Sequence, residues 1–123
     1  MYWEFQDDRP IYAQIIEQMK RFIISGSFHP GEKLPSVRDL AAEAGVNPNT
    51  MQRALAELEQ TGLVYTQRTS GRFISDDPDL IQSLKTELAR ELLSRFLADM
   101  HTIGFTDAEI SALLQTYQGG IVL

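Results

Sequence analysis

The chain of 123 residues contains no cysteine, two histidines and a single tryptophan. Without cysteine it can form no disulfide, no thiolate metal site and no cysteine nucleophile, which is typical of proteins from a reducing compartment. The two histidines, His29 and His101, stand far apart in the sequence. A zinc site or a histidine-based catalytic centre needs side chains of these types, and the chain has very few of them. We therefore expect neither a metal nor another cofactor.

Long apolar runs are also missing. No run approaches the roughly 18 residues that a membrane-spanning helix needs. The first residues lack the basic stretch and apolar core of a secretory signal, so we expect a cytoplasmic protein with no membrane partner. No Gly-rich phosphate loop, Gly-x-Ser-x-Gly or His-Glu-x-x-His pattern occurs, and we predict that the chain is not an enzyme.

Positive charge is scarce and unevenly spread. The net charge is −6 and the isoelectric point is near 4.8. Residues 1–75 carry eight Lys and Arg against nine Asp and Glu, whereas residues 76–123 carry three against eight. An acidic balance is unusual for a nucleic-acid-binding protein, so local features must support that interpretation. Between residues 33 and 72 the balance is +1, with five basic and four acidic residues.

The first part of the chain predicts three helices followed by a hairpin. Apolar residues at helical spacing predict helices over 10–25, from Ser36 to about 44, and over 47–61. Two short stretches rich in β-branched and aromatic residues, 63–67 and 71–75, predict strands. This order is that of a winged helix-turn-helix domain, which we assign to residues 1–75.

The composition changes at residues 76–79, where three aspartates flank Pro78. We place a domain boundary there and predict one helix to about Thr102, a break at Gly104 and a last helix to about Tyr117. The fold class expected for the whole chain is therefore mainly α with a small β-hairpin wing. It consists of a winged helix-turn-helix domain followed by a two-helix region over 76–123.

The helix predicted after residue 79 is too apolar for a single buried face. Ten large apolar residues between 80 and 103 cover well over a third of its circumference, so it needs two partners. The last helix provides one, and a second copy of the chain is the simplest other. We predict a homodimer with an interface that includes Leu84, Leu88, Leu92, Phe96 and Met100. The alternative is a monomer in which the winged domain covers this helix.

Four ordered segments carry a more specific signal: PGEKLPSVRDLA (30–41), GVNPNT (45–50), ALAELEQTGLV (54–64) and GRFI (71–74). Together they closely resemble the DNA-binding domain of the GntR family of bacterial transcription regulators, over about residues 10–75. The short two-helix tail resembles that of the YtrA-like subfamily. In the wing, Thr69 and Arg72 replace a glycine and a threonine that the family often has.

The resemblance and the helix pattern point to the same candidate DNA contacts. Asn49, Thr50, Gln52 and Arg53 lie at the outer, N-terminal side of the 47–61 helix, which would enter the major groove. The resemblance implies a further contact from Arg38. Contacts to the DNA backbone or minor groove are expected from Ser36, Arg68, Thr69, Ser70 and Arg72, and Asn47 is a further DNA-binding candidate.

Some of these residues have structural alternatives. Ser36 and Asn47 are expected to cap helices first and to contact DNA second. Arg38 could instead pair with Asp39 or Glu43, and Arg53 could be a solvated helix charge.

The predicted function is that of a sequence-specific regulator of transcription, a repressor that binds a palindromic DNA operator as a homodimer. The alternative is a winged-helix module for protein–protein interaction without DNA, which the near-neutral charge of residues 33–72 favours. A small-molecule effector is left unassigned. Tyr2, Trp3 and Phe5 are expected to pack against the winged domain.

Overall fold

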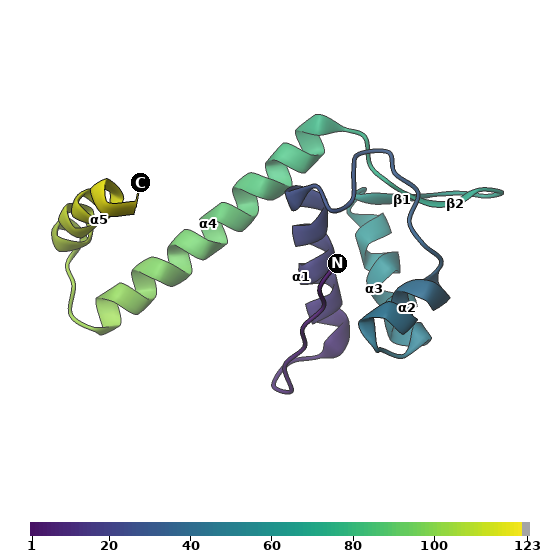
Figure 1. Cartoon of the computed structure of the whole chain (residues 1–123), viewed down its shortest axis with the longest axis horizontal. Coiled ribbons are helices and arrows are strands. Elements are labelled where there is room, and N and C mark those ends of the chain that lie inside the picture. The colour runs from purple at the N-terminus through teal and green to yellow at the C-terminus, as the bar shows by residue number, and fades with distance from the viewer. Residues whose placement is uncertain (122–123) are drawn as a thin grey trace. The chain divides into compact units, whose positions relative to one another are not determined.

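The computed structural model describes residues 1–121, with side chains to residue 117, and confirms the expected fold class (Figure 1). The elements in chain order are α1 (Ile11–Ser25), α2 (Val37–Ala44), α3 (Pro48–Gln60), β1 (Val64–Gln67), β2 (Gly71–Ile74), α4 (Pro78–Thr102) and α5 (Asp107–Ile121). The chain forms two compact units, Met1–Lys85 and a second that begins at Thr86.

The boundary between the units lies inside α4 and not at the change of composition near residue 76. The first turns of α4 belong to the winged unit because their apolar side chains pack on its core. Leu80 and Ile81 are partly buried there, and Leu84 is only 8% exposed. Leu84 is therefore covered within its own chain, although its helical spacing to Leu88 and Leu92 predicts a place in a dimer interface.

The core of the winged unit joins the inner faces of all three of its helices to the hairpin. Helix α1 contributes Ile15 and Met19, and α3 contributes a face that is fully buried. At about 25 cal/mol per Å² of apolar surface, this burial is the main stabilising contribution to the unit. The fully buried residues of α3 are Met51, Ala54, Leu55 and Leu58.

The hairpin is held to the helices by the segment that precedes α2. Strands β1 and β2 pair antiparallel, with Val64 opposite Ile74 and Gln67 opposite Gly71. The N–H of Ile74 donates to the carbonyl of Glu32 (2.8 Å), and the N–H of Leu34 donates to that of Arg72 (2.8 Å). Residues 32–34 thus line the second edge of β2, a pairing that the sequence pattern does not predict.

A carboxylate on α3 binds both strands of the hairpin, one residue pair before the turn. Arg72 on β2 donates from Nε to Oε1 of Glu59 over 2.6 Å, and the hydroxyl of Thr66 on β1 donates to the same oxygen. The hydrogen bond from Thr66, together with the bond and charge of Arg72, lowers the pKa of Glu59 against the opposing effect of partial burial.

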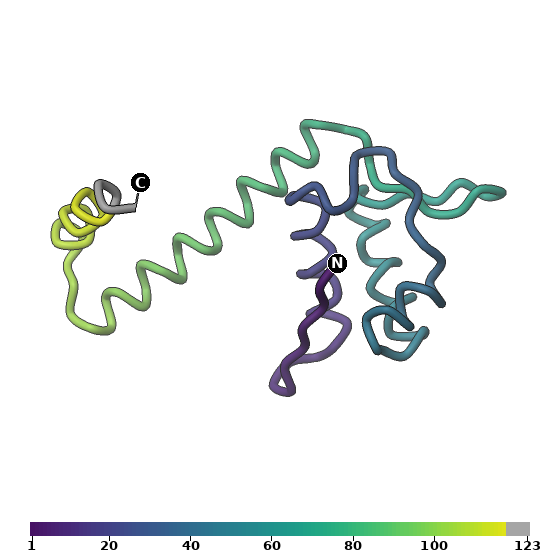
Figure 2. The backbone as a smooth tube through the Cα atoms, viewed as in Figure 1, coloured from purple at the N-terminus to yellow at the C-terminus, as the bar shows by residue number. Residues whose placement is uncertain are grey.

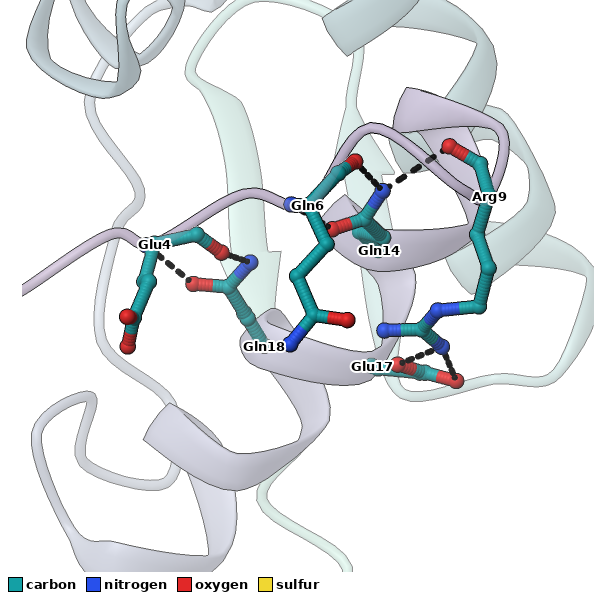
Figure 3. Close-up of polar contacts among 6 residues, drawn as sticks. All are labelled: Glu4, Gln6, Arg9, Gln14, Glu17 and Gln18. Carbon is teal, nitrogen blue, oxygen red and sulfur yellow. Dashed lines mark hydrogen bonds and ion pairs between the residues drawn. The ribbon is translucent and has the colours of Figure 1, made fainter.

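Residues 3–9, which we name the N-terminal strap, precede α1: residues 3–6 run along the helix, and residues 7–9 form the turn that leads into it (Figures 2 and 3). The side-chain amide of Gln14 accepts the N–H of Gln6 (2.8 Å) and donates to the carbonyls of Gln6 (2.8 Å) and Arg9 (2.9 Å). Gln18, one turn later, pairs in the same way with the backbone of Glu4. The two side-chain amides therefore supply the hydrogen-bond partners that a neighbouring strand usually gives to an extended segment.

Aromatic packing also holds the strap against α1. Trp3 meets Phe22 edge to face with ring centroids 4.9 Å apart, and it stacks on Phe5. Trp3 and Phe5 are partly buried against the core, as their composition predicts. The same expectation is wrong for Tyr2, which is 78% exposed. Among the described residues, Tyr2 makes none of the ring contacts that hold Trp3.

In the second unit, a tight turn joins α4 to α5. Gly104 adopts a left-handed conformation (φ +98°), and Thr106 and Glu109 form a capping box at the start of α5. His101 contacts Asp107 across the turn, with 2.7 Å between Nε2 and Oδ1. Helix α5 continues to Ile121, so the predicted end near Tyr117 is wrong. Each of the two successive glycines near the end of α5 destabilises the helix by only about 1 kcal/mol. This cost is too small to end the helix there.

We predict that Gln14→Ala lowers the free energy of unfolding by about 1–3 kcal/mol, because it leaves one N–H and two carbonyls of the strap without partners. Gln18→Ala, which removes an exposed pair of contacts, is the matched control and should cost less. Urea unfolding followed by the fluorescence of Trp3, the single tryptophan, measures both. Equal stability of the two variants would contradict the role given to Gln14.

We also predict an acid-sensitive contribution from Glu59. A carboxylate with a lowered folded-state pKa stabilises the fold above its unfolded pKa, near 4.5, and loses this effect as the pH falls through the folded value. The stability difference between the wild type and Glu59→Gln should therefore shrink between pH 7 and pH 3. Glu57→Gln, an exposed change on the same helix, is the control. A difference that stays constant with pH would count against this contribution.

Candidate nucleic-acid interface

Helices α2 and α3 form the helix-turn-helix. Helix α2 ends at Gly45, which is left-handed (φ +72°), and the N–H of Val46 returns to the carbonyl of Ala41 (3.0 Å). Asn47 then caps α3 by accepting the N–H of Asn49 (2.8 Å), and Pro48 occupies the first helical position. A turn of only two residues therefore separates α2 from the cap of α3, which sets the direction in which α3 leaves.

The outer face of α3 is polar at its N-terminal half. Asn49, Gln52 and Arg53 are exposed, opposite the fully buried apolar face. The side chains of Asn49 and Gln52 make no hydrogen bond to any part of the chain that the structure describes, so both amides keep their donors and acceptors for a ligand. Thr50 differs from these three because it is half-buried. Side-chain amides in this position match the donor and acceptor pattern of adenine in the major groove.

Four of the predicted DNA contacts already have a structural partner. Ser36 accepts the N–H of Asp39 (3.1 Å) and caps α2, and Asn47 caps α3. Arg72 is bound to Glu59, with its side chain 21% exposed. Arg53 lies over the ring of Tyr12 on α1, with its guanidinium carbon 3.6 Å from the ring centroid.

Arg38 is exposed on α2 and pairs with neither Asp39 nor Glu43 within the described residues. The alternative that it serves as a partner for these acids on its own helix therefore gains no support from the geometry. Its guanidinium keeps all of its donors for another molecule.

Arg68, Thr69 and Ser70 form the tip of the hairpin and are exposed. The N–H of Ser70 donates to the carbonyl of Gln67 (3.0 Å), which closes the turn. Figure 1 shows the hairpin leaving the C-terminal end of α3, while the starts of α1 and α3 lie together at the opposite end. The candidates thus fall into two groups, one around the start of α3 and one at the wing tip.

Charge around these groups stays close to neutral. The ion pair between Arg72 and Glu59 removes one charge of each sign from the local balance. Four exposed cations and three exposed anions remain between residues 33 and 72, which keeps the balance at +1: Lys33, Arg38, Arg53 and Arg68 against Asp39, Glu43 and Glu57. The surface is therefore suited to a few specific contacts and not to a strong general attraction for phosphate.

Two other kinds of site are absent from residues 1–121. Among them, no three His, Asp or Glu side chains are grouped so that they could hold a metal ion. None of the described helices has the length and apolar character needed to cross a membrane.

Sequence reasoning missed Tyr12 and Glu59 as parts of this surface. Tyr12 belongs to the start of α1, beside the apolar stripe, and no local pattern indicates that it meets Arg53 on another helix. For Glu59 the sequence offers one weak indication: Arg72 and Thr66 stand on paired strands that follow α3 directly, within reach of a residue at the end of that helix. Both contacts depend on tertiary packing.

The comparisons with known proteins agree with this geometry. The model of the bacterial regulatory proteins, gntR family, matches residues 11–74. The chain is 39% identical over 117 residues to the uncharacterized HTH-type transcriptional regulator YhcF of Bacillus subtilis (strain 168), covering 95% of this chain and 97% of the relative. It is 42% identical over 97 residues to the HTH-type transcriptional repressor YtrA of the same organism, covering 77% of this chain and 74% of the relative.

Solved structures give the same result. A GntR family transcriptional regulator from Listeria monocytogenes has a TM-score of 0.83 and 38% identity, over 91% of this chain and 98% of that one. AraR(DBD), solved in complex with operator ORX1, has a TM-score of 0.55 and 29% identity, over 61% of this chain and 96% of that one. As the motifs between residues 30 and 74 predict, the chain belongs to the gntR family of bacterial regulatory proteins and is a winged-helix transcriptional regulator related to YtrA.

Proposed function

We propose that the chain represses transcription by binding a palindromic DNA operator as a homodimer. The observation that carries the proposal is the outer face of α3, where Asn49 and Gln52 are exposed and uncommitted. In the proposed complex, α3 enters the major groove and these amides contact adenine edges. Arg38 and the wing tip, Arg68 to Ser70, contact the DNA backbone. The AraR(DBD) complex with an operator supports this mode of action.

The remaining predicted contacts take a secondary part in this proposal. Ser36 and Asn47 orient the starts of α2 and α3, and Arg72 holds the wing through Glu59. Thr50 lies half-buried beside the exposed amides and reaches the backbone at most. The proposed role involves no catalysis and places the protein with the chromosome, in the bacterial cytoplasm.

The second unit supports the dimer. Beyond Lys85, Ile110 is the only apolar side chain that is buried among those that the structure describes. One buried residue cannot stabilise two helices, so the apolar surface needs a cover. A second copy offers an identical surface, and a two-fold axis would present two copies of α3 to two half-sites. The exposed residues are Leu92, Leu93, Phe96, Leu97, Ile103, Leu113, Leu114 and Tyr117.

We therefore propose residues 76–123 as the dimerisation region. Its first turns also complete the winged core through Leu84, as described above. The interface then includes the predicted Leu92 and Phe96, which are exposed, and the predicted Leu88 and Met100, which are half-buried.

A second candidate function is favoured by the weak positive charge of the surface. A winged-helix module that binds only other proteins needs no excess of Lys and Arg. Its binding would lack the steep salt dependence that release of counterions from DNA produces. Binding sites selected from a random duplex library at near-physiological salt distinguish the two functions. A palindromic motif supports the regulator, and the absence of binding even at low salt supports the protein-binding module.

On the selected operator, we predict that Asn49→Ala or Gln52→Ala weakens binding by about 5- to 150-fold, equivalent to about 1–3 kcal/mol per lost base contact. Discrimination between operator variants should relax at the contacted base pair, because an alanine cannot read it. Gln60→Ala, an exposed amide at the end of α3, is the control and should bind normally. Equal loss in all three variants would argue against base reading by the start of α3.

We predict that Phe96→Glu converts the dimer to a monomer at micromolar concentration, because it places a charge in an apolar interface. Ser94→Glu puts the same carboxylate at an exposed position on the opposite side of α4 and should leave the dimer intact. Sedimentation velocity of both variants measures this, with circular dichroism as a check on folding. A dimeric Phe96→Glu variant would contradict the proposed interface.

A further inference from the structure

We propose that Tyr12 is a positioning residue that holds the guanidinium of Arg53 for contact with a DNA phosphate at the edge of the major groove. The inference rests on the proposed function and adds to it a residue from α1, outside the helix-turn-helix and the wing. The observation behind it is the contact in which Arg53 lies over the ring of Tyr12, with 3.6 Å between the guanidinium carbon and the ring centroid.

The stack restrains Arg53 without using its hydrogen-bond donors. A guanidinium that lies over an aromatic ring offers its face to the ring, and its N–H groups point outward from the edge. Arg53 makes no hydrogen bond and no ion pair among the residues that the structure describes. Glu57, one turn further along α3, is at a spacing that commonly pairs with arginine, yet Arg53 contacts the ring instead. The donors are therefore free for a ligand.

Tyr12 is itself held firmly. Helix α1 begins at Ile11, and the buried Ile15 and Met19 fix it against the core that includes α3. The amide of Gln14 also holds the carbonyl of Arg9, just before the helix, and the guanidinium of Arg9 meets the carboxylate of Glu17 at 2.9 Å (Figure 3). Because both ends of the stack stand on fixed helices, Arg53 loses side-chain freedom before it binds.

The position of the stack favours phosphate over a base edge. Arg53 lies one turn beyond Asn49 and leans toward the start of α1, away from the helix-turn-helix. In a groove about 12 Å wide, a helix that reads bases along its middle has the two phosphate backbones at its flanks. A side chain drawn to one flank by α1 therefore meets the backbone. Phosphate contacts of this kind set the register of the protein on the duplex.

The stack makes a guanidinium at this position different from an ammonium. An arginine can keep its face on the ring while its edge binds phosphate, whereas a lysine has one charged group for both partners. Arg53→Lys is therefore expected to retain only part of the affinity, and its binding should depend less on Tyr12.

The test measures binding of the full chain to its selected operator at several salt concentrations. We expect Tyr12→Leu to weaken binding about three- to tenfold and Tyr12→Phe, which keeps the ring, to bind within about twofold of the wild type. Arg53→Ala should weaken binding to all operator variants alike and reduce the salt slope by about one. In the Arg53→Ala background, Tyr12→Leu should have no further effect.

Each outcome decides between these explanations. If the wild type selects no operator, the proposed function fails and this inference falls with it. If the wild type binds and Tyr12→Leu is unchanged, only this inference is overturned. Equal loss in Tyr12→Phe and Tyr12→Leu would assign the role to the hydroxyl and not to the ring. A loss of discrimination at a single base pair in Arg53→Ala would make Arg53 a base contact. Additive losses in the double variant would make Tyr12 independent of Arg53.

Discussion

The burial of one face of α3 is the constraint on which the rest of the molecule depends. Met51, Ala54, Leu55 and Leu58 are fully enclosed by α1, α2 and the hairpin, so rotation of α3 about its axis would expose apolar surface at a large cost. Fixing this face also fixes the opposite one, where Asn49 and Gln52 stand. Specific recognition needs side chains held in a defined orientation, and here the hydrophobic core provides that orientation.

The sequence was sufficient to predict most of the winged unit because its signals are local. Caps at Ser36 and Asn47 and left-handed glycines mark helix ends, and the apolar spacing of α3 identifies its inner face. Two features were not predictable in this way. Residues 32–34 pair with β2 through backbone atoms alone, which leave no trace in side-chain patterns. Helix α5 extends to Ile121 because helical hydrogen bonds tolerate glycine when no competing turn is favoured.

The candidate interface was predictable in its position and less so in its details. Exposure of Asn49, Gln52 and Arg38 follows from helical periodicity, and the structure agrees. The partners of Arg72 and Arg53 do not follow, since Glu59 and Tyr12 approach them only in the folded chain. Arg72 is the clearest example, because its charge is used to hold the wing to α3.

The N-terminal strap has a consequence for how the chain can vary in length. Gln14 and Gln18 are spaced by four residues of helix, about 6 Å, which nearly equals two residues of extended chain, about 6.6 Å. This match pairs them with Gln6 and Glu4. Insertion or deletion of a single residue between Glu4 and Gln6 would break the match and turn Trp3 away from Phe22. Relatives that keep this arrangement should therefore vary freely in composition at the exposed Asp7 and Asp8 but keep the spacing from Glu4 to Gln6.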